Sequence, residues 1–177
     1  MQPILIGRGF IQTHKFIGKL SYGLAPLVVV SILFVAREKY FRLEHEVSAS
    51  QNLGELTVNV CSMFYFSLLY VLAIYFRKNT AIHMRFMISS ALLVLDPGLG
   101  RIFTNHIGTS FDDSVVYSVI ITEILTVILL VNDLRKGLPY IPYTLSLFFL
   151  ASFQILWAFR YSDIWQAFLS GFVKLVF

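Results

Sequence analysis

The sequence predicts an all-α polytopic membrane protein: a helical bundle of about five transmembrane helices, with a C-terminal amphipathic helix at the membrane interface. The 177-residue chain is 57% hydrophobic and only 14% charged, against about 45–50% and about 25% in an ordinary soluble domain. Its 17 Phe and 9 Tyr residues exceed what a soluble core of this size can bury. Its basic residues cluster just outside the apolar runs, which is typical of membrane topology and not of nucleic-acid binding.

Five apolar segments are long enough to cross a bilayer, which takes about 20 residues. The apolar residues run on continuously and do not alternate with polar ones, although polar groups interrupt the third segment and one carboxylate interrupts the fourth. This favours helices over the strands of a barrel, where polar and apolar residues alternate over about 10 residues. No shift in composition marks a second domain, so residues 1–177 are expected to form a single integral-membrane helical domain. The expected spans are 17–36, 56–76, 81–103, 114–131 and 141–159.

The distribution of Lys and Arg predicts the orientation of the spans. Basic residues such as Arg77, Lys78 and Arg85 are more frequent beside the span ends on the side of the N-terminus, and they are less diluted by acids there. By the positive-inside rule this favours a cytoplasmic N-terminus. We therefore expect a multi-pass membrane protein whose N-terminus lies in the cytoplasm.

The segment 162–177 is too short to span a membrane, but its apolar residues, including Trp165, fall on one helical face. Ser162 and Asp163 are candidates for the N-cap of this helix. Two placements are open: a helix lying in the interface and anchored by Trp165, or a helix packed back against the bundle.

The third span contains the most unusual polar residues. A charge at bilayer depth costs at least about 2.5–3.5 kcal/mol, so Asp96 and Arg101 are expected to pair with each other or to face water. Pro97 lacks an amide proton, and two glycines follow it, so we expect one helix to end near Leu95 and a half-helix to begin at Pro97. Such a break is tolerated only where protein or water covers it, and its free backbone groups are able to bind an ion or small ligand.

Glu123 lies in the middle of the fourth span, among apolar residues and two threonines. A carboxylate at this depth is a functional-site hypothesis by default. The short connection between spans three and four suggests that Glu123 meets Arg101 or Asp96. The three residues are thus candidates for an ion or proton site, and the alternative is a structural ion pair that holds helices together.

The four histidines are arranged in two pairs by side. His14 precedes the first span and His45 follows it, whereas His83 opens the third span and His106 follows it. A b-type haem needs two imidazoles facing each other from different helices at similar depth. Two pairs lie on the same side of the membrane, as haem ligation requires: His14 with His83, and His45 with His106. One hypothesis is therefore that these residues bind haem or a metal ion. The alternative is four interfacial histidines without a ligand.

Two short motifs resemble those of a known group of proteins. They are a His-x-x-x-Gly-Lys motif at His14 and a His-x-Arg-x-Met motif at His83. They are similar to motifs of an uncharacterised bacterial multi-pass inner-membrane protein family, and some similar families are linked to cytochrome oxidase assembly. The resemblance implies a helical inner-membrane protein with paired histidines near the cytoplasmic face, and no established reaction. It leaves open whether a further helix precedes the first motif.

No motif of a soluble enzyme is present in the sequence, and an enzymatic function is not expected. The leading hypothesis is an integral membrane protein whose polar intramembrane cluster handles a small solute or protons, or which acts as an accessory subunit. The alternative is a haem- or metal-binding membrane protein of redox chemistry or assembly, using His14 and His83, and a third is a purely structural partner. The cofactor stays unknown. The expected partner is the lipid bilayer, and nucleic acid is excluded as a partner. Whether the chain forms a homo-oligomer or joins a membrane complex stays open.

Overall fold

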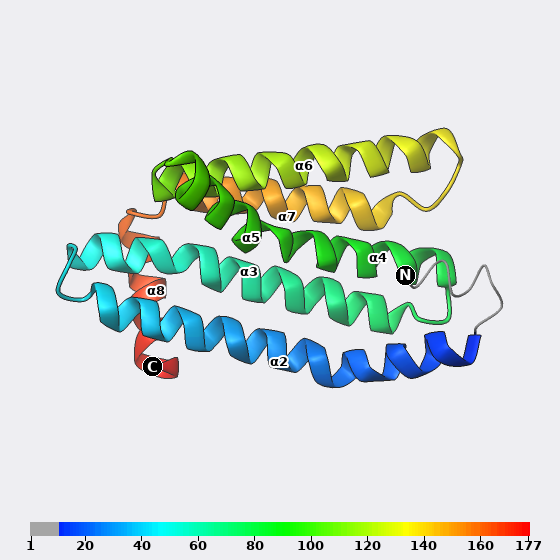
Figure 1. The fold of residues 1–177 in the computed structure, drawn as a ribbon, viewed down its shortest axis with the longest axis horizontal. Helices are drawn as coiled ribbons and strands as arrows, with labels where there is room; N and C mark the ends of the chain where they lie inside the picture. Colours follow the sequence, from blue (N-terminus) through cyan, green and yellow to red (C-terminus); the bar gives the residue numbers. More distant parts are fainter. Residues whose placement is uncertain (1–10) are drawn as a thin grey trace.

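The structure, a computed structural model, describes residues 11–177, without the side chains of residues 11, 13–15 and 17. These residues form helices and no strand, and the long helices lie side by side along the long axis of the molecule (Figure 1). The elements are α2 (Ile11–Leu43), α3 (Ala49–Tyr75), α4 (Thr80–Leu93), α5 (Leu95–Ile102), the π-helix η1 (Phe103–Ile107), α6 (Phe111–Arg135), α7 (Ile141–Ala158) and α8 (Asp163–Val176).

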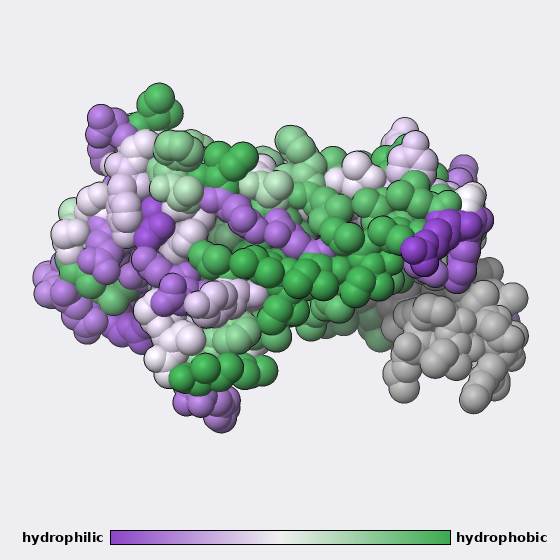
Figure 2. Space-filling view, turned by 90° about the horizontal axis from the view of Figure 1, so that it is seen from above, coloured by the Kyte–Doolittle hydropathy of each residue, from purple (hydrophilic) through white to green (hydrophobic). Residues whose placement is uncertain are grey.

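Five helical segments are long and apolar enough to cross a membrane, which confirms the predicted all-α membrane bundle. They cover 18–43, 49–75, 80–107, 111–135 and 141–158. Large apolar side chains face outward along them: Phe34, Phe64 and Phe148 are 62%, 64% and 64% exposed. Figure 2 shows a mainly hydrophobic central band between hydrophilic ends. Such a large exposed apolar surface is stable in the hydrocarbon of a membrane and not in water.

Local signals end the helices and keep their connections short. The side chains of Ser48, Asn79 and Ser110 are N-caps that accept hydrogen bonds from backbone amides of the first turns of α3, α4 and α6. After α6 the backbone turns at Gly137, whose φ of +62° favours glycine. The third and fourth predicted spans begin within four residues of the Asn79 and Ser110 caps, whereas α3 begins seven residues before the predicted start of the second span, at the Ser48 cap.

The core of the bundle lies between α3, α4, α6 and α7. Leu69 and Ala73 on α3 are fully buried against Phe86 on α4, Val119 on α6 and Leu150 on α7. The helix α2 lies outside this group and packs mainly along α3. It is therefore a peripheral helix, with one principal neighbour.

The predicted break in the third span is present, two residues earlier than expected. The helix α4 ends at Leu93, and the amide of Val94 bonds to the carbonyl of Ala91, a tighter turn than in an α-helix. Asp96 lies in the first turn of α5 and does not cap it. Before the break the chain packs along α3, whereas after it α5 packs along α6 (Figure 1). The break thus directs the second half of this span away from α3.

The C-terminal helix α8 combines the two placements that the sequence left open. It crosses the end of the bundle at which α2 ends and α3 begins (Figure 1). Leu169 is completely buried beside Leu56 and Val60 of α3, and the Trp165 indole donates a hydrogen bond to Thr57 Oγ1 at 2.8 Å. The outer face is open, with Ile164 87% exposed. The helix therefore packs on the bundle and also presents an apolar face to its surroundings.

Candidate functional site

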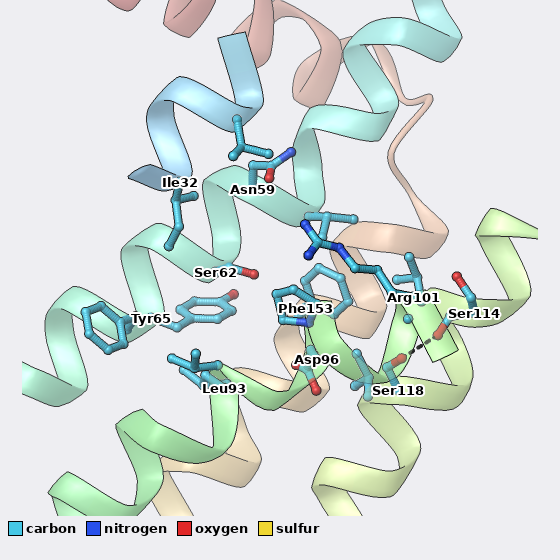
Figure 3. Close-up of a pocket in the computed structure, with 18 of the residues that line it drawn as sticks. Ile32, Asn59, Ser62, Tyr65, Leu93, Asp96, Arg101, Ser114, Ser118 and Phe153 are labelled. Carbon is cyan, nitrogen blue, oxygen red and sulfur yellow. Dashed lines mark hydrogen bonds between the residues drawn. The ribbon is translucent and has the colours of Figure 1, made fainter. Parts of the chain in front are cut away.

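A cavity of about 610 Å³ lies between the peripheral helix α2 and the rest of the bundle. Its walls come from α2, α3, the α4–α5 junction, α6 and α7 (Figure 3). Val35 of α2 and Val94 at the junction line it and are 55% and 50% exposed, so the cavity opens to the surface between these two segments. Its volume is in the range of about 300–1,000 Å³ typical of small-molecule sites.

The break after α4 makes this cavity. Because α5 packs along α6 and not along α3, a wedge-shaped space separates α3 from α5. The helix α2 covers this space from one side only. Small residues keep the wedge open: Gly100 of α5 and Ser62 of α3 line it, together with Ser118 of α6 (Figure 3). A cavity that is mainly apolar with a few hydroxyl groups results, as ligand pockets commonly are.

Three basic side chains line the part of the cavity near the end of the bundle where α2 ends. Lys39 is already engaged, because its Nζ lies 2.8 Å from Glu55 Oε2 and 3.7 Å from the centre of the Phe111 ring. Arg42 and Arg101 form no ion pair with any residue that the structure describes. Figure 3 shows the Arg101 side chain reaching across the cavity towards α3. Two guanidinium groups are therefore available to a ligand.

Asp96 also lines the cavity, but it does not form the expected pair with Arg101. Its Oδ1 accepts a hydrogen bond from Thr122 Oγ1 of α6 at 2.5 Å. The carboxyl group is thus held against α6, while Arg101 extends from the same helix towards α3 (Figure 3). Of the two predicted alternatives, the Asp96–Arg101 ion pair is absent, because α5 packs on α6, where a threonine is within reach of Asp96. The other alternative, that these side chains face water, stays a prediction.

Glu123 stands apart from this cavity. Gln154 of α7 donates a hydrogen bond from Nε2 to Glu123 Oε2 at 2.8 Å. The structure forms no ion pair of Glu123 with Arg101 among the residues it describes, and Glu123 is not a lining residue. Of the three candidates for an ion or proton site, Asp96 and Arg101 share one cavity and Glu123 does not. That they bind an ion stays a prediction.

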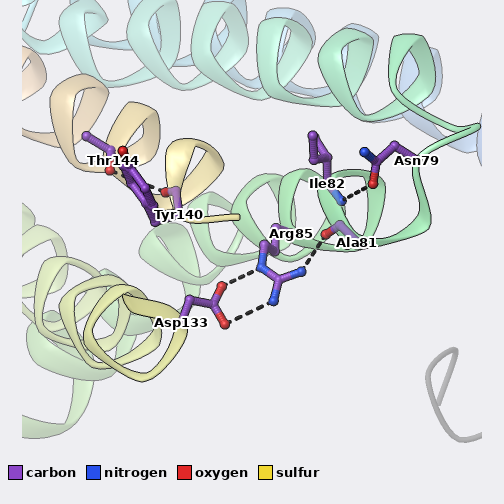
Figure 4. A network of polar contacts seen from close by, with 7 residues as sticks. All are labelled: Asn79, Ala81, Ile82, Arg85, Asp133, Tyr140 and Thr144. Atoms are coloured by element: carbon purple, nitrogen blue, oxygen red, sulfur yellow. Dashed lines mark hydrogen bonds and ion pairs between the residues drawn. The ribbon is translucent and has the colours of Figure 1, made fainter. Parts of the chain in front are cut away.

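A buried ion pair joins Arg85 of α4 to Asp133 of α6, a contact that sequence reasoning missed. The guanidinium contacts the carboxylate in a two-pronged arrangement, through Nε to Oδ2 and through Nη2 to Oδ1 at 3.0 Å (Figure 4). Nη1 donates to the carbonyl of Ala81 at 2.7 Å. The side chains are only 4% and 6% exposed. The sequence did contain an indication of this pair. Asp133 is the one acid among the segments outside the expected spans on the side of the N-terminus, where several basic residues lie.

The histidines lie at both ends of the bundle. His45 lies in the α2–α3 connection and His106 in η1, at the same end (Figure 1). His83, at the other end, donates from Nδ1 to the carbonyl of Ala73 at 2.7 Å, an acceptor in the last turn of α3. The side chain of His14 lies outside the described residues. Among the described residues no group of three or more His, Cys, Asp or Glu residues could hold a metal ion.

Comparisons of this chain with protein-family models, curated proteins and solved structures found no match. The fold and its cavity define the class: a helical membrane protein with five candidate spans in residues 11–177 and an open cavity between them that is basic at one end.

Proposed function

We propose that this membrane protein handles a small solute, which it binds in the cavity between α2 and the rest of the bundle. The observation that carries the proposal is the cavity of about 610 Å³ with Asp96 and Arg101 on its wall. A packed helical bundle has few voids larger than a water molecule. A cavity of this size, with polar groups converging on it at membrane depth, is the default binding site of such a protein.

The proposal predicts that filling the cavity removes the ligand. Ser62 lines the cavity and forms no side-chain hydrogen bond with any residue that the structure describes, so Ser62→Phe places an aromatic ring in the space. We expect native mass spectrometry of protein released from membranes to show a bound non-protein mass in the parent chain. This mass should be lost in Ser62→Phe.

The matched control is Ala151→Phe, which adds a similar ring at an exposed position of α7 that does not line the cavity. It should keep the bound mass. A parent chain that carries no bound mass, or a Ser62→Phe variant that keeps it, would contradict the proposed function. Equal thermal stability of the two variants confirms that the loss is due to occupation of the cavity and not to unfolding.

The alternative proposal, a haem or metal ion held by His14 and His83, is favoured by one contact. His83 donates its Nδ1 proton to the Ala73 carbonyl, which leaves Nε2 as the ring nitrogen with a free lone pair. Metal-ligating histidines commonly have such a partner on their second nitrogen. The same contact also satisfies a free carbonyl at the end of α3, because the Arg77 amide bonds to Ile74.

A spectrum separates the two proposals. If His83 holds haem, purified protein shows a Soret band, and His83→Ala abolishes it. If it holds a metal ion, elemental analysis finds about one ion per chain, which His83→Ala removes. His106→Ala, at the other end of the bundle, is the control for a general effect of losing an imidazole. Colourless, metal-free parent protein contradicts this alternative and leaves the solute-binding proposal standing.

We also propose that the host membrane is a bacterial cytoplasmic membrane, with the N-terminus on the cytoplasmic side. Arg77 and Lys78 at the α3–α4 connection and Arg135 and Lys136 at the end of α6 support this orientation. Arg85 does not, because its charge is buried against Asp133. In this orientation the basic end of the cavity lies in the outer leaflet.

A further inference from the structure

The cavity between α2 and the bundle is polar in one part and apolar in the other. Its basic residues belong to the last two turns of α2 and the last turn of α5, near one end of the bundle. The deeper lining residues are mainly apolar, among them Val28, Phe66 and Leu93, with a few hydroxyl groups and one acid, Asp96. A bilayer has the same polarity, with head groups at its surface and hydrocarbon inside. A ligand lying along this cavity would therefore have a polar end near the surface and an apolar end inside.

The length of the cavity matches a lipid chain. Lining residues of α2 run from Val28 to Arg42, and 14 residues of helix extend about 21 Å. The hydrocarbon core is about 30 Å thick, so one acyl chain of one leaflet occupies about 15 Å. This leaves room for a head group beside Arg42. Val35 and Val94, which flank the opening, lie within two candidate membrane spans, so we infer that the opening is a route of entry from the bilayer.

The positive charge at the polar end of the cavity favours a ligand with an anionic head group. Arg42 and Arg101 come from opposite walls, and neither has an acidic partner among the residues described. The guanidinium fork matches the oxygens of a carboxylate or phosphate group. The one acid on the wall, Asp96, lies five residues before Arg101, about 7.5 Å deeper along the helix, and is bonded to Thr122. It therefore does not neutralise the two arginines.

We propose that the ligand of this cavity is a single-chain amphiphile with an anionic head group, either a carboxylate or a phosphate monoester. The head group binds Arg101 and Arg42, and the chain lies against the apolar wall of α2 and α3. This inference rests on the proposed solute-binding function and names the chemical class of the solute.

The test measures binding to parent protein in phosphatidylcholine nanodiscs, by thermal shift and by native mass spectrometry. The probes are oleate, oleoyl lysophosphatidate, oleoyl lysophosphatidylcholine and inorganic phosphate. We expect oleate or lysophosphatidate, or both, to bind at least about tenfold more tightly than lysophosphatidylcholine, since a hydrogen bond to a charged group contributes this much. The better of the two anions identifies the head group as a carboxylate or a phosphate monoester.

The decisive variant is Arg101→Gln, with Arg37→Gln as its matched control. Both remove one positive charge from the same end of the bundle, but Arg37 does not line the cavity and its nearest ion-pair partner is the exposed Glu38. We expect Arg101→Gln to weaken binding of the anionic amphiphile about tenfold and Arg37→Gln to leave it unchanged. Arg101→Lys should retain part of the affinity because it keeps the charge.

Three results would overturn the inference. They are equal affinity for lysophosphatidylcholine and the anionic amphiphiles, the same effect of Arg101→Gln and Arg37→Gln, and inorganic phosphate that binds at Arg101 as well as an amphiphile does. If Ser62→Phe still removes a bound mass in any of these cases, the cavity binds a solute of another class and the proposed function stands. If the parent carries no ligand and binds none of the probes, both fail.

Discussion

Replacing Arg85 by glutamine should lower the free energy of unfolding by about 3–5 kcal/mol, because it leaves the buried Asp133 carboxylate without its partner. Removing the other partner, by Asp133→Asn, should lower the free energy of unfolding by a similar amount, because it leaves a buried guanidinium unpaired. The double variant should lose less than the sum of the two, since no charge then remains uncompensated. Unfolding of detergent-solubilised protein, titrated with denaturant and followed by circular dichroism, measures all three free energies.

The matched control for this pair is Arg135→Gln. Arg135 lies two residues after Asp133 on α6, is exposed, and forms no ion pair among the described residues. Its substitution should change the stability by less than about 0.5 kcal/mol. If Arg85→Gln were no more costly than Arg135→Gln, or if the two single losses simply added, the pair would not stabilise the bundle.

Truncating Leu169 should have the second largest effect, a loss of about 2–5 kcal/mol, because the residue is completely buried where α8 packs on α2 and α3. Leu169→Ala leaves a cavity beside Ala36 and Leu56 that the surrounding helices fill only in part. We expect a lower melting temperature and faster proteolytic cleavage in the 159–162 connection, measured on purified protein.

Leu175→Ala is the control on the same helix. Leu175 is 86% exposed, so its truncation removes apolar surface from the outer face of α8 and leaves the packing on α3 unchanged. The melting temperature should stay close to that of the parent chain. If the two truncations had the same effect, α8 would be attached by its outer face and not by Leu169.

Periodicity and hydropathy were enough to predict the architecture. The five spans follow from continuous apolar length, and the break near Pro97 from the missing amide proton and the two glycines. The C-terminal helix follows from the apolar face that includes Trp165. These features depend on short stretches of sequence, which is why they could be read without knowing how the helices pack.

The partners of the polar side chains could not be predicted in the same way. Asp96 bonds to Thr122 and Glu123 to Gln154, and each contact depends on how α5, α6 and α7 are rotated about their axes. A rotation of one residue, about 100°, changes the neighbour entirely. The cavity was also beyond prediction, since it results from the path of α5 along α6 and from the peripheral place of α2.

The distance along the chain between Arg85 and Asp133 has a consequence for biosynthesis. The two residues are 48 positions apart, and Asp133 belongs to α6, which is synthesised later than α4 with α5 and η1 in between. When α4 leaves the ribosome, its guanidinium has no counter-charge at membrane depth, so the helix is not at its most stable position until α6 has been inserted. We therefore expect the integration of these two helices into the bilayer to be coupled, with the later helix completing the insertion of the earlier.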